Sequence, residues 1–265
     1  MIILIPMGGH GSRFSDAGYK TNKACIPVTD RHTGKKLPMI VCAMKDIHGI
    51  KNKKNTVICV DRKLHEKNGT EKKIKYFFPY TKFIHDHVLL DQAFGCFLAR
   101  EYLESDDQLF IGTCDNGFKY DKKKFLKLKK IFDVLMISHT NDENIRANPD
   151  AHSWANIKNK NQIKSISIKK TVSKNPMNDH ATTGMFWFKK SNFFLKNLEK
   201  MIWNKDTYQG KYYVDKVLNY CIKSGLKVGY FDVEYISWGT PYDYEIYEKT
   251  YSYWKKFLRK EKNSD

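Results

Sequence analysis

The residues best suited to chemistry lie in one short loop near the start of the chain. After an apolar run at residues 2–6, residues 8–14 read GGHGSRF, and Lys23 follows ten residues after Arg13. Glycines let the backbone approach a ligand closely, and N–H groups at the end of a strand can converge on a phosphate. With Arg13 and Lys23 adding two cations, the loop predicts a ligand that carries phosphate groups.

Three phosphate-binding templates compete for this loop. The P-loop requires Gly-x-x-x-x-Gly-Lys-Ser/Thr, which the chain lacks. The dinucleotide fingerprint would place its third glycine at Phe14, whose side chain would obstruct close helix packing. The third template, Gly-x-Gly-Ser/Thr-Arg followed by a lysine, fits residues 9–13 together with Lys23. Taken alone, Arg13 and Lys23 could also be ordinary surface cations of a basic protein.

A carboxylate follows a second apolar segment. Residues 107–118, DQLFIGTCDNGF, predict a buried strand that ends at Asp115. The carboxyl ends of parallel strands are where α/β sheets bind their ligands. Asp115 is therefore a candidate site residue, with a turn-capping aspartate as the alternative.

The elements around these residues predict an α/β fold. Strands at 1–6, 55–61 and 107–118 alternate with helices at 37–50 and 91–105, which is the doubly wound pattern of a mostly parallel sheet. After about residue 140 the pattern changes. The later segments predict two antiparallel strands within 153–170, strands at 182–190 and 227–236, and helices at 191–203, 212–225 and the end of 237–260.

Composition excludes several classes of protein. The chain has 265 residues, of which 41% are hydrophobic and 14% aromatic, as in a globular protein with a sizeable core. The six cysteines form no C-x-x-C pair, unlike a zinc site or a disulfide scaffold. No apolar run approaches the roughly 20 residues needed to cross a bilayer, so we expect a cytoplasmic protein without membrane insertion.

The net charge of +18 has two interpretations. It could attract nucleic acid. However, the lysines are scattered along the chain among Asn, Ile, Tyr and Phe, which is typical of codon bias in an AT-rich genome. We therefore expect no nucleic-acid partner.

Over nearly its whole length, the sequence resembles the nucleotidyltransferase family that makes activated sugars and related compounds from a nucleoside triphosphate and a phosphorylated acceptor. The glycine loop carries the resemblance first. It continues in LLDQAFGCFLAREYLESDDQLFIGTCDNGF at residues 89–118, then in HSWANIK, HATTGMFWFKKSNFF, YYVDKVLNYCIKSGLKVGYFDV and WGTPYDYEIY. Each motif is weak alone, but their order along the chain is specific.

The resemblance implies the architecture and the partners of the protein. It implies a single domain over 1–265 with a Rossmann-like, mostly parallel mixed sheet and a small β-rich lobe on the acceptor side. Residues 1–140 would bind the nucleotide and 141–265 the acceptor. The expected partners are a nucleoside triphosphate and a phosphorylated small molecule, and the expected cofactor is Mg²⁺ or Mn²⁺.

The resemblance also implies roles for individual residues. The catalytic residues would be Arg13, Lys23 and Asp115. The nucleotide-binding residues would be Met7, Gly8, Gly9, His10, Gly11, Ser12, Gln92 and Ala93. The acceptor-binding residues would be Trp154, Lys169, Thr183, Gly184 and Asn219. The metal ligands would be Asp115 and Glu234.

The chain departs from the family pattern at two places. Ser237 occupies the position of a second metal-binding aspartate, so either Glu234 or Asp232 replaces it or Asp115 holds the metal largely alone. The Glu-Lys pair that grips sugar hydroxyls falls at residues 168–170, where no acid is present. That loss argues against a hexose 1-phosphate and suggests an acceptor with an anionic or carbonyl-bearing end.

Three alternatives remain open at the level of sequence. The protein could use a sugar 1-phosphate or phosphocholine as acceptor. It could be a catalytically silent nucleotide-sensing module, which the doubtful second acid permits. A nucleic-acid binder is supported only by the net charge of +18.

Overall fold

The computed structural model describes residues 1–87 and 91–262. The strands are β1 (Ile2–Pro6), β2 (Pro27–Thr29), β3 (Lys36–Pro38), β4 (Thr56–Arg62), β5 (Lys82–Asp86), β6 (Leu109–Ile111), β7 (Asn116–Lys119), β8 (Val134–His139), β9 (Trp154–Asn159), β10 (Gln162–Ser167), β11 (Ala181–Phe188), β12 (Val228–Asp232) and β13 (Glu234–Ser237). The α-helices are α1 (Ser12–Asp16), α2 (Met39–Lys45), α3 (Thr70–Phe77), α4 (Gln92–Phe97), α5 (Arg100–Leu103), α6 (Lys122–Ile131), α7 (Glu143–Ala147), α8 (Ser191–Trp203), α9 (Val214–Lys223) and α10 (Pro241–Lys262). Short 3₁₀ helices are η1 (Lys23–Cys25), η2 (Lys63–Asn68), η3 (Pro149–Ala151) and η4 (Pro176–Asn178).

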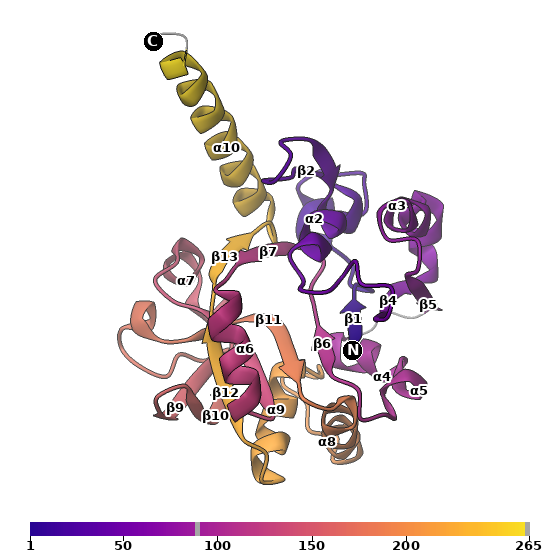
Figure 1. Cartoon of the computed structure of the whole chain (residues 1–265), viewed down its shortest axis with the longest axis vertical. Helices are drawn as coiled ribbons and strands as arrows, with labels where there is room; N and C mark the ends of the chain where they lie inside the picture. The colour runs from indigo at the N-terminus through magenta and orange to yellow at the C-terminus, as the bar shows by residue number, and fades with distance from the viewer. Residues whose placement is uncertain (88–90, 263–265) are drawn as a thin grey trace.

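One mixed sheet runs through both halves of the chain, in the order β5-β4-β1-β6-β11-β8-β12-β10-β9. The first four strands pair in parallel, as the alternation of strands and helices predicts. β11 then enters antiparallel between β6 and β8. The sheet is therefore parallel throughout its first part and mixed in its second part, where β8 and β12 again pair in parallel (Figure 1).

The second part of the sheet closes on itself. β11 also pairs with β9, through Ala181 and Trp154, so that β11, β8, β12, β10 and β9 form a five-stranded ring. The expected doubly wound sheet is thus corrected to a mixed sheet with a closed ring. Periodicity could not show this, because the closing pair joins residues 27 positions apart in sequence.

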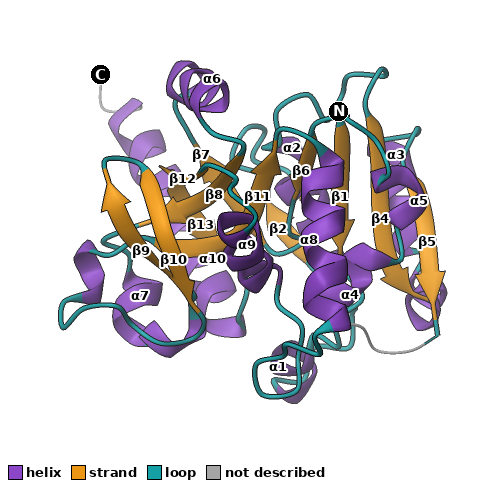
Figure 2. Cartoon of the chain, turned by 90° about the horizontal axis from the view of Figure 1, so that it is seen from below, coloured by secondary structure: helices purple, strands orange, loops and turns teal. Residues whose placement is uncertain are grey.

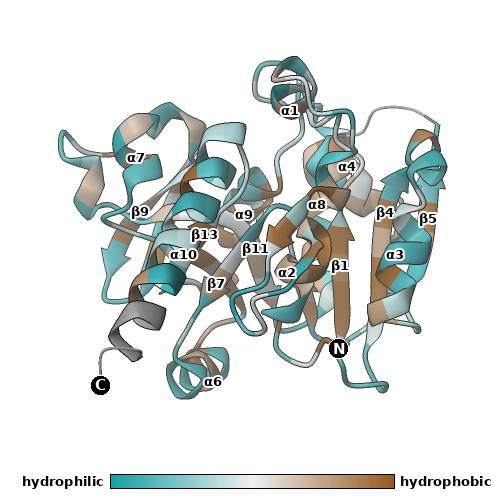
Figure 3. Ribbon diagram, turned by 90° about the horizontal axis from the view of Figure 1, so that it is seen from above, coloured by the Kyte–Doolittle hydropathy of each residue, from teal (hydrophilic) through white to brown (hydrophobic). Residues whose placement is uncertain are grey.

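Helices cover both faces of the sheet and bury two apolar cores. On β1, Ile2 and Leu4 face the core under α4, α8 and α9, whereas Ile3 and Ile5 face the core under α2, α3 and α6. This alternation follows from the two-residue period of a strand. Figures 2 and 3 show α4, α8 and α9 on one face and α2 and α3 on the other, and β1 is apolar along its length in Figure 3.

Two small antiparallel pairs accompany the main sheet. β2 pairs with β3, and β7 pairs with β13 so that Asn116 lies opposite Ser237. From β13 the chain enters α10, which extends away from the rest of the protein (Figure 1). None of the helices described in the structure is long and apolar enough to span a membrane.

The expected bounds agree best with the structure where an expected segment forms a single helix or a single hairpin. The helix at 191–203 is α8 with the same bounds, and the hairpin within 153–170 is β9 and β10. Other segments divide: 91–105 forms α4 and α5, and 227–236 forms β12 and the beginning of β13. Residues 37–50 begin with the end of β3, and their helix is only Met39–Lys45.

Candidate active site

The glycine loop begins where β1 ends. The Met7 N–H donates to the Val60 carbonyl oxygen at 2.8 Å and ties the start of the loop to β4. Gly11 has φ +64 and immediately precedes α1. A Cβ on Gly11 would also lie only 3.1 Å from the Lys23 Cβ, so both the backbone angle and the close approach favour glycine here.

Lys23 is held against this loop and reaches Asp115. Asn22 precedes η1 and accepts a hydrogen bond from the Ala24 N–H at 2.9 Å, which fixes the turn that carries Lys23. The Lys23 ammonium donates to Asp115 Oδ2 at 2.5 Å and to the Gly239 carbonyl oxygen at 3.0 Å. Three segments far apart in sequence therefore meet at one ammonium group.

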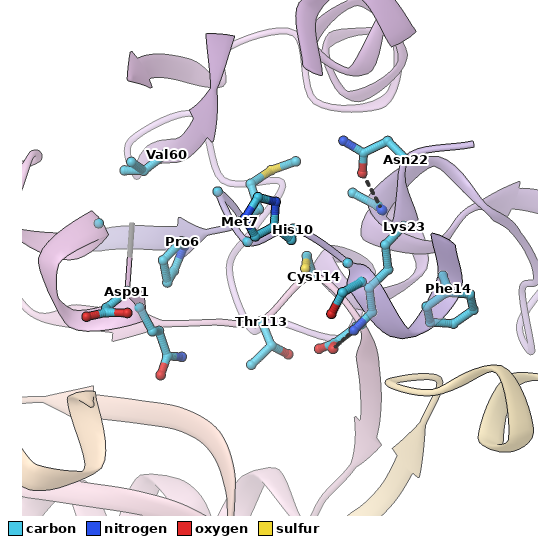
Figure 4. A pocket seen from close by; sticks show the side chains of 18 of the residues that line it. Pro6, Met7, His10, Phe14, Asn22, Lys23, Val60, Asp91, Thr113 and Cys114 are labelled. Atoms are coloured by element: carbon cyan, nitrogen blue, oxygen red, sulfur yellow. Dashed lines mark hydrogen bonds and ion pairs between the residues drawn. The ribbon is translucent and has the colours of Figure 1, made fainter. Parts of the chain in front are cut away.

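A cavity of about 410 Å³ lies over the loop. Residues 6–14, Lys23, Asp115 and Gln92 contribute to its lining. Figure 4 shows Met7, His10, Lys23 and Thr113 around this space. A volume of this size is typical of small-molecule sites.

The charges at the cavity suit an anionic ligand. Burial raises the pKa of the Asp115 carboxyl, but Lys23 and Arg13 outweigh burial and hold the pKa below its ordinary value. Asp115 therefore stays ionised near neutral pH. Arg13 is exposed on α1, where its guanidinium is open to a phosphate from solvent.

The residues expected to bind the nucleotide mostly lie together. Met7, Gly8, Gly9, His10, Gly11, Ser12 and Gln92 all line the cavity. Gln92 Nε2 donates to the Gly184 carbonyl oxygen at 3.3 Å. Ala93 does not line the cavity: it is fully buried in the core beneath α4, where its small side chain allows close packing.

The residues expected to bind the acceptor divide into two groups. Trp154 is fully buried and donates its indole N–H to the Pro149 carbonyl oxygen, so it packs in the core. Asn219 uses its amide to bond the Ile166 backbone N–H and carbonyl, which joins α9 to β10. Thr183 and Gly184 lie in an irregular stretch of β11 that touches Gln92, and Lys169 is half-buried near Arg13.

The surroundings of Asp115 fit a divalent ion that is also bound by phosphates. Mg²⁺ commonly takes one or two carboxylates, substrate oxygens and water. A Cβ on Gly239 would lie 3.4 Å from Asp115 Oδ2 and 3.6 Å from Ser237 Oγ, so a glycine leaves space between these two oxygens. Within residues 1–87 and 91–262, no three His, Cys, Asp or Glu side chains gather as a ready-made metal cluster.

The structure does not bring Glu234 or Asp232 to Asp115. Glu234 is exposed and pairs with Lys119 at the far end of the β7–β13 pair, three residues along β13 from Ser237. Asp232 accepts hydrogen bonds from Ser138 at 2.7 Å and His180 at 2.8 Å. Instead, Ser237 Oγ donates to Asp243 Oδ2 at 2.9 Å, which makes Asp243 the second carboxylate near this position.

Sequence reasoning missed further residues around the cavity. Thr113 and Lys211 line it, and the Thr113 hydroxyl is buried without a hydrogen-bond partner among the described residues. Arg62, at the end of β4, lies 3.1 Å from His10 Nδ1 through its Nη1 and adds a cation beside the loop. Arg62 is the last residue of an apolar strand, and Asp115 comes shortly after another. This position at a strand end is the sequence feature that could have identified Arg62.

Comparison with solved structures shows a shared fold. The nucleoside-diphosphate-sugar pyrophosphorylase from Vibrio cholerae RC9 matches with a TM-score of 0.73 at 18% identity, covering 92% of this chain and 98% of that one. The inositol-1-phosphate CTP transferase from T. maritima matches with a TM-score of 0.63 at 19% identity, covering 93% of each chain. HddC from Yersinia pseudotuberculosis, complexed with GMP-PN, matches with a TM-score of 0.64 at 16% identity, covering 94% and 99%.

No protein-family model matches the sequence, and no curated protein matches it either. At these identities the solved structures establish the fold alone. The chain has the mixed α/β fold of nucleotidyltransferases along nearly its full length.

Proposed function

We propose that the protein is a nucleotidyltransferase that transfers a nucleoside monophosphate from a nucleoside triphosphate to a phosphorylated small molecule. The observation that carries this proposal is the convergence of Arg13, Lys23 and Asp115 on one cavity beside a glycine loop. In this account the chain acts as one domain, in which residues 1–140 bind the nucleotide and 141–265 bind the acceptor.

The reaction follows from the charges of its participants. An acceptor phosphate oxygen attacks the α-phosphorus, a new P–O bond forms, and the bond to pyrophosphate breaks. The attacking oxygen is already anionic, so no general base is needed. The main task of the protein is to hold several anions together and to stabilise the charge that grows on the leaving group.

The cations of the site divide this task. Arg13 grips the leaving pyrophosphate, where its planar guanidinium can donate two parallel hydrogen bonds. Lys23 lies between the α-phosphate and the acceptor phosphate as a compact charge. Its bond to Asp115 positions the ammonium before the substrates arrive.

Asp115 would hold Mg²⁺ or Mn²⁺, with phosphate oxygens completing the coordination. When bound, this ion supplies charge neutralisation at the transferred phosphate. Ser237 and Asp243, which are hydrogen-bonded to each other, would support the ion from the other side, in the role first expected of Glu234.

The preferred substrates are CTP and L-glutamine phosphate, giving CDP-L-glutamine and pyrophosphate. The sequence as a whole most resembles the CTP:phosphoglutamine cytidylyltransferase of bacterial capsular polysaccharide phosphoramidate synthesis. The missing acid at residues 168–170, which would grip sugar hydroxyls, supports this choice over a hexose 1-phosphate. The inositol-1-phosphate CTP transferase is a structural neighbour whose name includes the same nucleotide.

The test is a matrix of substrates with product identification. The four nucleoside triphosphates are each incubated with Mg²⁺ and with L-glutamine phosphate, phosphocholine or a sugar 1-phosphate, and products are identified by mass spectrometry. We expect CDP-L-glutamine to form fastest. A faster sugar or choline product would keep the reaction and overturn the acceptor, whereas no nucleotide-linked product in any mixture would overturn the proposed function.

A further inference from the structure

A buried carboxylate lies on the acceptor side of the site and is only partly used by the protein. Asp215 is 5% exposed and lies in the first turn of α9. Its Oδ2 accepts a hydrogen bond from Ser153 Oγ at 3.0 Å. Its Oδ1 is buried and has no hydrogen-bond partner among the residues that the structure describes. A buried carboxylate oxygen without a donor is costly, so a missing partner needs an explanation.

The helix dipole explains part of this placement but not the unused oxygen. A carboxylate is favoured in the first turn of a helix. However, burial raises the pKa of the Asp215 carboxyl, against the opposing effects of Lys169, Ser153 and Thr182. The local donors therefore do not fully compensate the carboxylate for its loss of water, and a further donor would stabilise it.

Lys169 is the cation that acts electrostatically on Asp215, and its ammonium lies against Tyr213, two residues before Asp215. Lys169 has φ +54, an uncommon backbone angle for a residue with a side chain. Its ammonium donates to the Ala151 carbonyl oxygen and lies 5.6 Å from the centre of the Tyr213 ring. Burial lowers the pKa of Lys169, Asp215 raises it, and Arg13 lowers it further. Lys169 therefore lies within electrostatic reach of both the carboxylate and the phosphate-binding loop.

The bulged part of β11 connects Asp215 to the nucleotide cavity. The Thr182 N–H donates to the Ser153 carbonyl oxygen at 2.9 Å, and the Ser153 hydroxyl donates to Asp215. Two residues after Thr182, the Gly184 carbonyl oxygen accepts from Gln92, which lines the cavity. Gly184 has φ +80, and a Cβ there would lie 3.3 Å from Thr113 Cγ2, so the strand passes close to the cavity. Asp215 is thus linked to the cavity through this stretch of β11.

The two charges are close enough to influence each other, yet they do not form a direct ion pair. Each therefore retains hydrogen-bonding capacity for a ligand. The carboxylate needs a donor, and an ammonium would provide a charge-assisted hydrogen bond. Lys169 can donate to an anionic oxygen next to it. A hydroxyl could reach either residue, but it would offset less of the cost of a buried charge.

We propose that Asp215 and Lys169 form a subsite for the head group of the acceptor, and that this head group is a zwitterion of the amino-acid type. The ammonium of the ligand donates to Asp215 Oδ1, and its carboxylate accepts from the Lys169 ammonium. This inference rests on the proposed function, because it places the phosphate of the same ligand near Lys23. It adds Asp215 to the acceptor residue Lys169 expected from the sequence, so that the two select the acceptor by charge at the end away from the reaction.

The experiment measures acceptor binding separately from turnover. Isothermal calorimetry is performed on the full chain with L-glutamine phosphate, with its N-acetyl derivative and with its carboxamide derivative. Asp215→Asn and Lys169→Gln are compared with the exposed controls Asp150→Asn and Lys170→Gln, and thermal unfolding confirms that each variant is folded.

We expect the wild type and both controls to bind L-glutamine phosphate about 10- to 100-fold more tightly than either derivative. Asp215→Asn should lose this factor for the parent ligand and become indifferent to N-acetylation, whereas Lys169→Gln should become indifferent to loss of the carboxylate. If a variant instead binds L-glutamine phosphate and both derivatives more weakly by the same factor, the residue has a structural role and the inference is overturned.

Turnover then separates the two proposals. One outcome is that the protein releases pyrophosphate with a sugar 1-phosphate while Asp215→Asn leaves the calorimetric affinity for L-glutamine phosphate unchanged. That result would keep the nucleotidyltransferase and discard the zwitterion subsite. Charge-specific binding of L-glutamine phosphate without pyrophosphate release from any nucleoside triphosphate would keep the subsite and discard the reaction. Failure of the wild type to bind L-glutamine phosphate in calorimetry would overturn the subsite directly.

Discussion

The sharpest stability prediction concerns His139, at the end of β8. It is 1% exposed, and both ring nitrogens are buried without hydrogen-bond partners among the described residues. Its ring centre lies 4.3 Å from that of Tyr235 and 5.2 Å from that of His152. Burial, and then His152, lowers the pKa of His139 from 6.5 to about 4, against the smaller opposing effects of Asp142 and Asp232.

The sign of the pH dependence follows from which state binds the proton. Between about pH 4 and 6.5 the unfolded chain protonates this imidazole, whereas the folded chain keeps it neutral. The contribution to stability is therefore present above pH 6.5 and is lost as the pH falls toward 4. At pH 5 the loss relative to pH 7 is about 2 kcal/mol in the free energy of unfolding.

The assay is urea-induced unfolding at pH 7 and pH 5, followed by tryptophan fluorescence. We compare the wild type with His139→Gln and with His87→Gln, whose ring is exposed. His139→Gln should be less stable at pH 7 because it loses ring packing, but its loss between pH 7 and 5 should be about 2 kcal/mol smaller. An equal loss in the wild type and His139→Gln would refute the assignment of a buried neutral imidazole.

Three further predictions concern the site. Lys23→Ala and Asp115→Asn should each reduce kcat by about 100-fold or more, as measured by pyrophosphate release, while Lys20→Ala leaves it unchanged; near-normal turnover would discard the assigned role. Gln92→Ala should change the ratio of kcat/KM between CTP and the other nucleotides, and an unchanged ratio would place the base contact elsewhere. Gly11→Ala should cost about 1 kcal/mol of stability through its positive φ and raise KM for the nucleotide by displacing Lys23; unchanged stability and KM would refute the positive φ and the close approach at Gly11.

The sequence was most informative where local pattern alone determines structure. The glycine loop was identifiable because its glycines follow an apolar strand, and in the structure Gly11 has a positive φ and lies close to Lys23. The helix α8 was identifiable from its apolar spacing and has the expected bounds. The five-stranded ring was not, since it depends on pairing Ala181 with Trp154, and nothing in either local pattern specifies a partner.

The side chains of the second half of the chain show the same limit. Trp154 and Asn219 are residue types that serve packing and ligand recognition equally well. In the structure both side chains are hydrogen-bonded to backbone groups. Asp215 is inconspicuous in the sequence because an acid at the start of a helix is common. Its unpartnered oxygen becomes visible only after the surrounding residues have been placed.

The position of the second acid was also beyond sequence spacing. Glu234 and Asp232, the two replacements that the sequence suggested for the acid missing at Ser237, both precede it, whereas the fold brings Asp243 to Ser237 from the first turn of α10. A strand, a turn and a helix start together determine that contact, and none of them alone predicts it.

The central claim is nucleotidyl transfer at the Lys23–Asp115 site. Its most direct measurement is ³¹P NMR of the protein incubated with Mg²⁺, CTP and L-glutamine phosphate, following pyrophosphate and a CDP-linked product together. The account predicts that both appear in equal amounts with the wild type and that neither appears at a comparable rate with Lys23→Ala. Pyrophosphate with CMP but no linked product, or equal rates in the wild type and the variant, would contradict it.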